Sequence, residues 1–272
     1  MNNLTYLLAL EWKKFYNNSV YRSLMLIYFL LSPVMIFLGK DIHKYIPVLV
    51  QNSSVFYEFP TVWDYQGYAG NWMASLCLGF LAIHLVTSEV SNRTMRQNII
   101  SGLTRKEYFL SKLFHILAIS AAATTLYAIS SILIGIIHTD GFDLELILDN
   151  NWAIARFFLM CFAYMAFGLM LAFLIRRGFL TLMTYFFYVF ALETIFMAVH
   201  VYYLKNSSRN FWPMNTIEDL MPLPLYRLPD FFVSTEYDFN ILLSYKTAAL
   251  MTILYTLAFT GIAWWSFSRK DV

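Results

Sequence analysis

The sequence predicts an all-α integral membrane protein with six transmembrane helices. Of its 272 residues, 59% are hydrophobic and only 13% are charged, whereas soluble domains average about 45–50% apolar and about 25% charged residues. One soluble core cannot bury so much apolar surface, and several apolar stretches are long enough to cross a bilayer. Because no second domain is evident, residues 1–272 are interpreted as a single six-span domain.

An amphipathic elbow helix is predicted before the first span, within residues 1–20. Its apolar face would carry Leu4, Leu7, Leu8, Trp12 and Phe15. A helix of this kind, with Trp at headgroup depth, lies flat on the membrane surface. A plain extension of the first span is the alternative, but the polar run Asn17-Asn18-Ser19 favours a bend.

Six stretches satisfy the roughly 20 apolar residues that a membrane span needs. They are residues 21–39, 68–88, 110–138, 152–175, 179–204 and 246–267. Pro33 is expected to kink the first span, which helix bundles tolerate. In the proline-rich outer segment 205–245, a short helix near Asn215 that dips toward the membrane and an ordered loop are equally consistent with the sequence.

The distribution of Lys and Arg orients the spans, because short cytoplasmic loops carry an excess of both. With the N-terminus inside, the inner segments hold 12 of the 19 basic residues and four of the 17 acids. The outer segments hold the other seven bases and 12 acids. Both termini are therefore expected in the cytoplasm, in a multi-pass protein of the cell (cytoplasmic or inner) membrane.

The segment between the second and third spans, residues 90–109, has a helical pattern with two faces. Met95, Ile99, Ile100 and Leu103 share one face, and Arg93, Arg96 and Gln97 share the other. A helix of about three turns with an apolar face, held at the water boundary, is suited to dock another protein. A segment that merely lies on the membrane surface is the alternative.

Motifs of catalysis and cofactor binding are missing. The sequence has no Walker A loop, His-Glu-x-x-His, Cys-x-x-Cys or Gly-x-Ser-x-Gly motif. We therefore expect no enzyme, and no cofactor or metal in this chain. Cys77 and Cys161 fall inside predicted spans and are expected to be packing residues. His84 and Glu89, five residues apart, are weak support for a metal or proton site.

Glu193 lies near the middle of the fifth span, where a charge costs about 2.5–3.5 kcal/mol on insertion scales. It should therefore face the bundle interior or a wet cavity. It either lines a translocation path or pairs across a subunit interface, or it is a protonated acid bonded to a Tyr or Thr of a neighbouring helix. The sequence leaves these possibilities open.

Together, the flat N-terminal helix, the six spans and the basic amphipathic helix resemble the permeases of ABC type-2 exporters. In that family a Glu ends the second span, followed by Gly-Thr-Leu, an apolar pair, a Pro, Ser/Thr-Arg and a Lys that starts the third span. The matching residues here are Glu89, Thr94, Met95, Ile99, Ile100, Thr104, Arg105 and Lys112. Arg93 stands where Gly is usual, and Gly102 stands where Pro is usual.

The resemblance implies that this segment docks a separate ATPase. The docking residues would be Glu89, Thr94, Met95, Arg96, Ile99, Ile100, Leu103, Thr104, Arg105 and Lys106. Their apolar side chains would fill a groove and their basic side chains would meet carboxylates at its rim. Two permease subunits, expected as a homodimer, would bind two copies of an ABC ATPase that holds the ATP and Mg.

The resemblance also implies that the second and fifth spans line the path, which places Glu193, Tyr185 and Tyr188 near the axis or the dimer interface. The predicted function is a permease subunit that couples ATP hydrolysis by its partner to export, with the lipid bilayer around it and no nucleic acid. Two alternatives remain. One is a mechanical transmitter that acts on an extracytoplasmic partner through residues 205–245. The other is an intramembrane enzyme that uses Glu193, His84 or His200.

Overall fold

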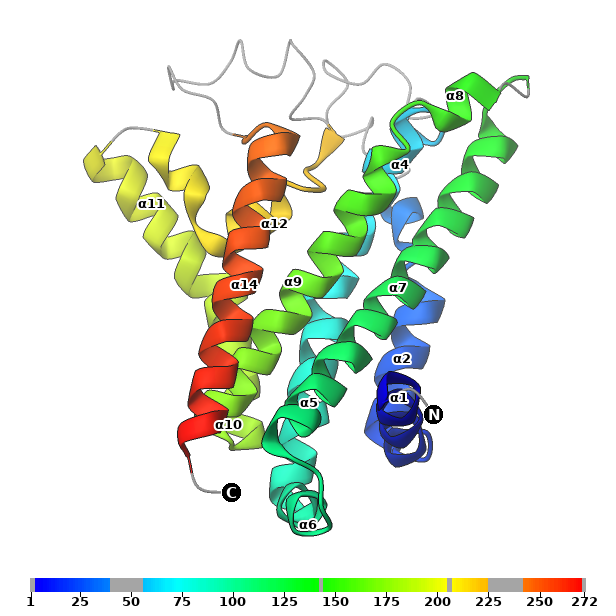
Figure 1. The fold of residues 1–272 in the computed structure, drawn as a ribbon. Helices are drawn as coiled ribbons and strands as arrows, with labels where there is room; N and C mark the ends of the chain where they lie inside the picture. The colour runs from blue at the N-terminus through cyan, green and yellow to red at the C-terminus, as the bar shows by residue number, and fades with distance from the viewer. Residues whose placement is uncertain (1–2, 40–55, 142–143, 205–206, 225–241, 271–272) are drawn as a thin grey trace.

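The chain folds into a bundle of helices (Figure 1). The computed structural model describes residues 3–39, 56–141, 144–204, 207–224 and 242–270, and none of these forms a strand. Both termini lie toward the end of the bundle that carries the short helix α6 (Thr94–Ile100). This end is the predicted cytoplasmic end, and we call it the inner end; the opposite end is the outer end.

Five helices are long and apolar enough to cross a membrane, and these five are Thr61–Ser91, Arg105–His138, Leu144–Ile175, Gly178–Leu204 and Tyr245–Arg269. The predicted first span is shorter than expected. Helix α2 (Ser19–Leu31) ends before Pro33, and the 3₁₀ segment η1 (Met35–Gly39) follows. Pro lacks the N–H that would continue the helix. The described residues therefore contain five long spans and one shorter apolar helix, and six full spans are not confirmed.

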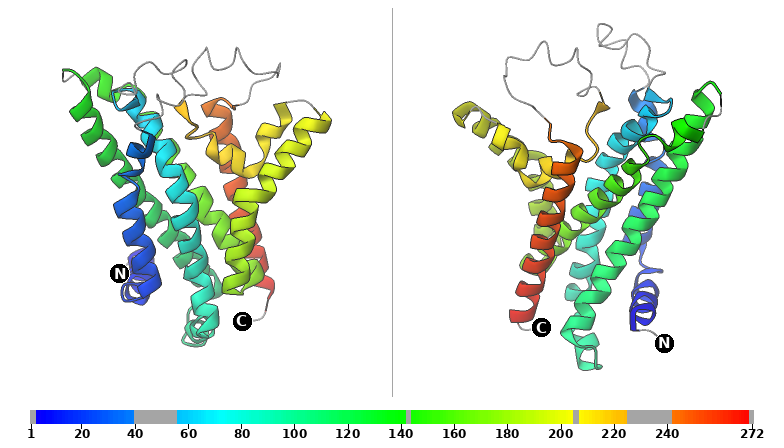
Figure 2. Two further views of the ribbon diagram at one scale, coloured as in Figure 1. Left: turned by 180° about the vertical axis from the view of Figure 1, so that it is seen from behind. Right: turned by 45° about the horizontal axis from the view of Figure 1, so that its top comes forward.

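Two of the spans contain a π-helical segment that the sequence did not indicate. The second span consists of α4 (Thr61–Met73), η3 (Ala74–Leu78) and α5 (Gly79–Ser91). The fifth consists of α10 (Gly178–Phe187), η4 (Tyr188–Leu192) and α11 (Glu193–Leu204). Beyond η4, helix α11 leans away from the rest of the bundle (Figure 2). Such segments are rare and occur frequently at functional sites.

Helix α9 (Trp152–Ile175) is the centre of the packing. It contacts α5, α7 (Arg105–His138) and α14 (Tyr245–Arg269), and most of its residues are buried. The helices α9 and α5 approach closely where two glycines meet, since a Cβ atom on Gly168 would lie 2.7 Å from the carbonyl oxygen of Gly79. Backbone contact of this kind is typical of helix packing in membranes.

Short helical elements lie at the outer end of the bundle. Helix α8 (Leu144–Leu148) precedes α9, and η5 (Ser207–Phe211) and α12 (Pro213–Glu218) follow α11. The short helix that the sequence suggested near Asn215 exists and begins two residues earlier, with Pro213 in its first turn, a favourable position for proline. It packs against α9 and α14. Of the predicted outer loop, residues 225–241 lie outside the described residues.

Candidate functional site

A buried ion cluster joins three helices at the inner end. The Lys112 ammonium of α7 lies 2.6 Å from Glu11 Oε2 of α1 (Asn3–Phe15) and 2.6 Å from Glu89 Oε1 of α5. The side chains of Lys112 and Glu11 are fully buried, and that of Glu89 is nearly so. One lysine therefore ties the elbow helix and the end of the second span to the start of the third.

Further side chains complete the cluster. The Lys14 ammonium lies 3.1 Å from Glu11 and 3.3 Å from Glu89, so two carboxylates face two ammonium groups. The Tyr108 hydroxyl donates to Glu89 Oε2 at 2.9 Å, and the Ser111 hydroxyl donates to Glu11 Oε1 at 3.1 Å. Buried charges are tolerated when they are paired and hydrogen-bonded in this way.

The pKa of Glu11 reflects this pairing. Burial by itself would raise the pKa of the carboxyl group, but the positive charges of Lys112 and Lys14 outweigh it and lower the pKa to about 2. Glu11 is thus ionised at neutral pH.

The cluster extends to α6 through Glu89. The Asn98 side-chain amide donates to Glu89 Oε2 at 3.2 Å, and the Thr94 hydroxyl donates to the backbone oxygen of Glu89 at 3.3 Å. A displacement of α6 must therefore act on Glu89, and through it on Lys112.

The two departures from the family pattern fall at the two ends of α6. Arg93, before the helix, has a φ of 59°, which is the left-handed region that glycine adopts most easily. This explains a Gly preference at that position. Gly102, after the helix, has a φ of 110°, which proline cannot adopt because its ring fixes φ near −65°. The turn between α6 and α7 is therefore incompatible with proline at this position.

The apolar side of α6 faces the protein itself, contrary to the expectation that it would be exposed. Met95 is 4% exposed, and Ile99 and Leu103 pack against the core. Ile100 alone of the four predicted apolar residues projects outward, with 75% of its surface exposed. The helix has two turns rather than three. Periodicity identified the face correctly, but the core of the chain, rather than a partner, covers most of it.

Other predicted docking residues also have partners within the chain. Thr104 caps α7 in a capping box with Glu107. The Arg105 guanidinium donates to the carbonyl oxygens of Ser268 at 2.8 Å and Lys270 at 3.0 Å, at the end of α14. Glu89 and Arg105 thus hold helices together within the chain. The exposed side chains near Ile100 are those of Arg93, Arg96, Gln97, Ser101 and Lys106.

The candidate axis residues lie inside the subunit. Glu193 is 2% exposed, and its Oε1 accepts a hydrogen bond from the backbone N–H of Asn215 at 2.8 Å. It therefore caps the first turn of α12, where a carboxylate is favourable. Tyr185 is fully buried and donates to the Ser75 carbonyl at 2.7 Å. Tyr188 is partly buried against the Phe167 ring. In this arrangement the Tyr185 side chain packs inside the subunit, between the second and fifth spans.

The residues of the enzyme alternative occupy separate environments. His84 lies 3.0 Å from the Asn18 side chain, and His200 lies 2.7 Å from the Ser208 hydroxyl, whereas Glu193 contacts Asn215. Within the described residues, no group of three His, Cys, Asp or Glu side chains could hold a metal ion.

Sequence reasoning did not anticipate the role of Glu11. The signal was present, because Glu11 stands four residues before Phe15 and so on the same face of α1 as a predicted apolar residue. Its partner Lys112 is 101 residues away, however, and a local pattern cannot pair them.

The fold and the inner cluster define a helical membrane protein in which the short helix α6 joins the second and third spans and is hydrogen-bonded to the ion cluster. Residues 12–272 match the family of ABC-2 family transporter proteins, and the chain belongs to that family. It is accordingly a multi-pass membrane protein, and the membership indicates a permease subunit of an ABC transporter. Membrane subunits of the family generally partner with an ABC ATPase. No curated protein matches the chain.

Proposed function

We propose that this chain is the permease subunit of an exporter and receives mechanical work from a separate ABC ATPase at α6. The ATPase holds ATP and Mg, and the chain itself is no enzyme. Two copies of the chain pair in the cell membrane, each with one ATPase subunit, and both termini face the cytoplasm.

The observation that carries the proposal is the connection of α6 to the ion cluster. Thr94 and Asn98 of α6 bond Glu89, Glu89 bonds Lys112, and Lys112 bonds Glu11. A force applied to α6 is thereby transmitted to the second span, the third span and the elbow helix together. A helix that only rested on the membrane surface would not need such bracing.

The proposed docking surface consists of Ile100, Arg93, Arg96 and Lys106, which are all exposed. A single projecting isoleucine surrounded by basic side chains suits an apolar pocket with an acidic rim. Beside this surface, a cavity of about 270 Å³ between α1 and α6 is lined by Lys14, Asn98 and their neighbours. It offers space for a partner side chain.

Ile100→Asp tests the docking surface without disturbing the core. The substitution should abolish co-purification of the ABC ATPase with the full-length permease, because a charge would enter the apolar pocket. Leu144→Asp, at a residue 61% exposed on the outer helix α8, is the matched control and should leave co-purification unchanged. Undiminished ATPase binding by Ile100→Asp, with normal folding, would refute the docking proposal.

The proposed orientation is tested by labelling single cysteines with a membrane-impermeant maleimide. The native Cys77 and Cys161 are both buried, so they give little background. A cysteine at Ser101 should react only from the cytoplasmic side, and one at Glu145 only from the outside. Labelling of both from one side would overturn the orientation.

A further inference from the structure

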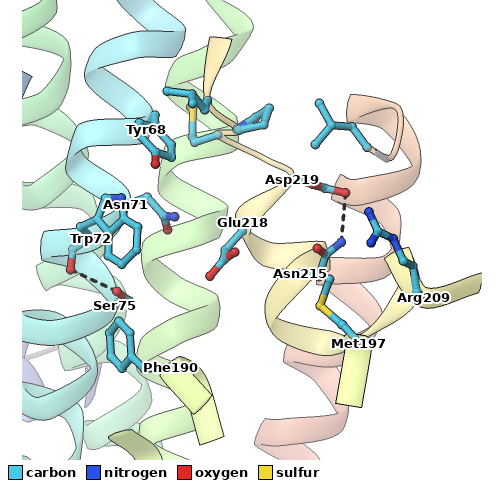
Figure 3. Close-up of a pocket in the computed structure, with 14 residues that line it drawn as sticks. Tyr68, Asn71, Trp72, Ser75, Phe190, Met197, Arg209, Asn215, Glu218 and Asp219 are labelled. Carbon is cyan, nitrogen blue, oxygen red and sulfur yellow. Dashed lines mark hydrogen bonds between the residues drawn. The ribbon is translucent and has the colours of Figure 1, made fainter. Parts of the chain in front are cut away.

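A cavity of about 320 Å³ lies between the second and fifth spans toward the outer end. One wall comes from the second span, with Tyr68, Asn71 and Trp72 of α4 and Ser75 of η3. Phe190 and Met197 of the fifth span line another part, and Glu218 of α12 projects into it from the opposite side (Figure 3). The cavity is separate from the inner cluster and from α6.

Glu218 is the exceptional residue of this cavity. Its side chain is exposed there, and among the described residues it has no hydrogen-bond or ion-pair partner. The neighbouring Asp219 differs, because it accepts from the Asn215 side chain at 3.3 Å and from the Leu243 backbone N–H at 2.9 Å. The Asp219 carboxylate therefore has hydrogen-bond partners within the described residues, whereas the Glu218 carboxylate faces the cavity.

Aromatic rings stand opposite Glu218. Trp72 and Phe190 are stacked with centroids 6.4 Å apart, and Tyr68 meets Trp72 edge-on at 6.5 Å. Arg209 also lines the cavity, but it lies on the far side of Asn215 from the aromatic wall (Figure 3). Ring faces carry partial negative charge and attract ammonium groups, and a nearby carboxylate strengthens the attraction.

We propose that this cavity binds an organic cation, a quaternary or protonated amine, with Glu218 as its counter-charge and the rings of Tyr68, Trp72 and Phe190 around it. The assignment of the bound cation as the transported cargo rests on the transport function proposed above. The binding of the cation does not depend on that function.

The protonation of Glu218 supports this assignment. Neighbouring protein atoms partly desolvate the carboxyl group, although its side chain stays open to the cavity, and this raises its pKa to about 8; the negative charges of Glu193 and Asp219 add to the effect. The other charged or titratable groups at the cavity are Arg209 and Tyr68. A cation therefore has to displace a proton from Glu218 at neutral pH. Its affinity should rise as the pH is raised from 6 to 8, because the ionised fraction of Glu218 grows.

The test uses the full-length permease in a nonionic detergent, with choline as the probe. Its uncharged isostere, 3,3-dimethylbutan-1-ol, has the same shape and reports the contribution of charge. We expect choline to bind at least about ten-fold more tightly than the isostere. Glu218→Gln should remove that preference and the pH dependence, while the matched control Glu145→Gln, on the exposed helix α8, should retain both.

Equal binding of choline and its isostere, no binding of choline, or an unchanged preference in Glu218→Gln would overturn the proposal. If Glu218→Gln fails to fold, Trp72→Leu serves instead, and it should weaken choline more than the isostere. ATPase co-purification is measured in parallel. Choline binding without ATPase binding would contradict the proposed function alone, and ATPase binding without choline binding would contradict the cavity proposal alone.

Discussion

The acidic side chains at the two ends of the molecule have opposite surroundings. At the inner end, Glu11 and Glu89 share Lys112 and Lys14 in a cluster shielded from water. At the outer end, Glu193 has no basic partner among the described residues and accepts from the Asn215 backbone N–H, and Glu218 faces a cavity with no hydrogen-bond or ion-pair partner in the same part of the chain. The comparison indicates that the inner acids hold helices together, whereas Glu218 remains free to pair with a bound cation as far as the described residues are concerned.

The same contrast appears in the helices that carry these acids. The inner cluster joins regular α-helix in α1, α5 and α7. The outer cavity lies beside the π-helical segments η3 and η4, where Ser75 and Phe190 are placed. Regular helices at the inner end and irregular helices beside the outer cavity, connected through α9, fit the proposed transporter, which would be driven at the inner end and bind its ligand at the outer end.

Removal of the central lysine should have the largest effect. Lys112→Met leaves Glu11 and Glu89 buried with Lys14 as their sole counter-charge, and should cost about 3–5 kcal/mol of stability. Thermal unfolding in detergent, followed by size-exclusion chromatography, measures the loss. Lys106→Met, at an exposed position, is the control and should be neutral, as should Glu218→Gln at the outer end.

A triple variant tests the charge of the inner cluster more sharply, because it should recover the stability that Lys112→Met loses. Adding Glu11→Gln and Glu89→Gln to Lys112→Met removes the uncompensated charges, and should restore much of the loss. A triple variant no more stable than Lys112→Met would mean that packing, and not charge, dominates the inner cluster.

The inner cluster should also respond to acid. Because the pKa of Glu11 is lowered in the folded chain from 4.5 to about 2, its contribution to stability is present above pH 4.5 and is lost as the pH falls toward 2. We expect α1 to become sensitive to pepsin over this range. In Glu11→Gln, the pepsin cleavage rate should change much less between pH 4.5 and pH 2, because the side chain at position 11 no longer titrates. A wild-type rate that shows no such transition would contradict the assigned charge state.

Helix α9, which connects the two ends of the molecule, packs closely against α5. Gly168→Ala would place a Cβ atom 2.7 Å from the Gly79 carbonyl oxygen, and should cost about 1–3 kcal/mol. Gly261→Ala is the matched control in α14, because nothing lies within 4 Å of its new Cβ atom, and it should be neutral or slightly stabilising. Comparable unfolding temperatures for the two variants would show that α5 and α9 can separate at little cost.

The smallest effect is expected from helix caps. Thr104 caps α7 at the inner end and Ser244 caps α14 at the outer end, and each side chain accepts from the backbone N–H three residues on. Replacement of either by Ala should cost about 1 kcal/mol. If the turn between α6 and α7 transmits force, only Thr104→Ala should also lower transport-coupled ATP hydrolysis. Equal losses of coupling in both variants would argue against a special role for the inner end.

The sequence best predicted the bounds of helices, because these depend on a single helix or a single helix cap. Residues 152–175 match α9 in both bounds. The third span begins at Arg105, five residues before the apolar run suggested, because the capping box of Thr104 and Glu107 marks the start and hydropathy does not. Proline likewise accounts for the early end of α2.

Long-range and orientational features could not be predicted from local patterns. Helical periodicity gives α6 an apolar face, but whether Met95 on that face meets a partner or the chain's own core depends on the position of the whole helix. The pairing of Glu11 with Lys112 and the cavity beside Glu218 arise only when distant helices come together. That Ile100 is the exposed one of the four predicted apolar residues of this segment therefore had to be identified from the structure.

The most direct test of the central claim places a photoreactive amino acid at Ile100 and, for comparison, at Leu144. Both variants are expressed with the ABC ATPase and irradiated in membranes with and without ATP. The account predicts a crosslink to the ATPase from position 100, with a yield that changes with nucleotide, and none from position 144. Crosslinks from position 100 to lipid only would contradict it.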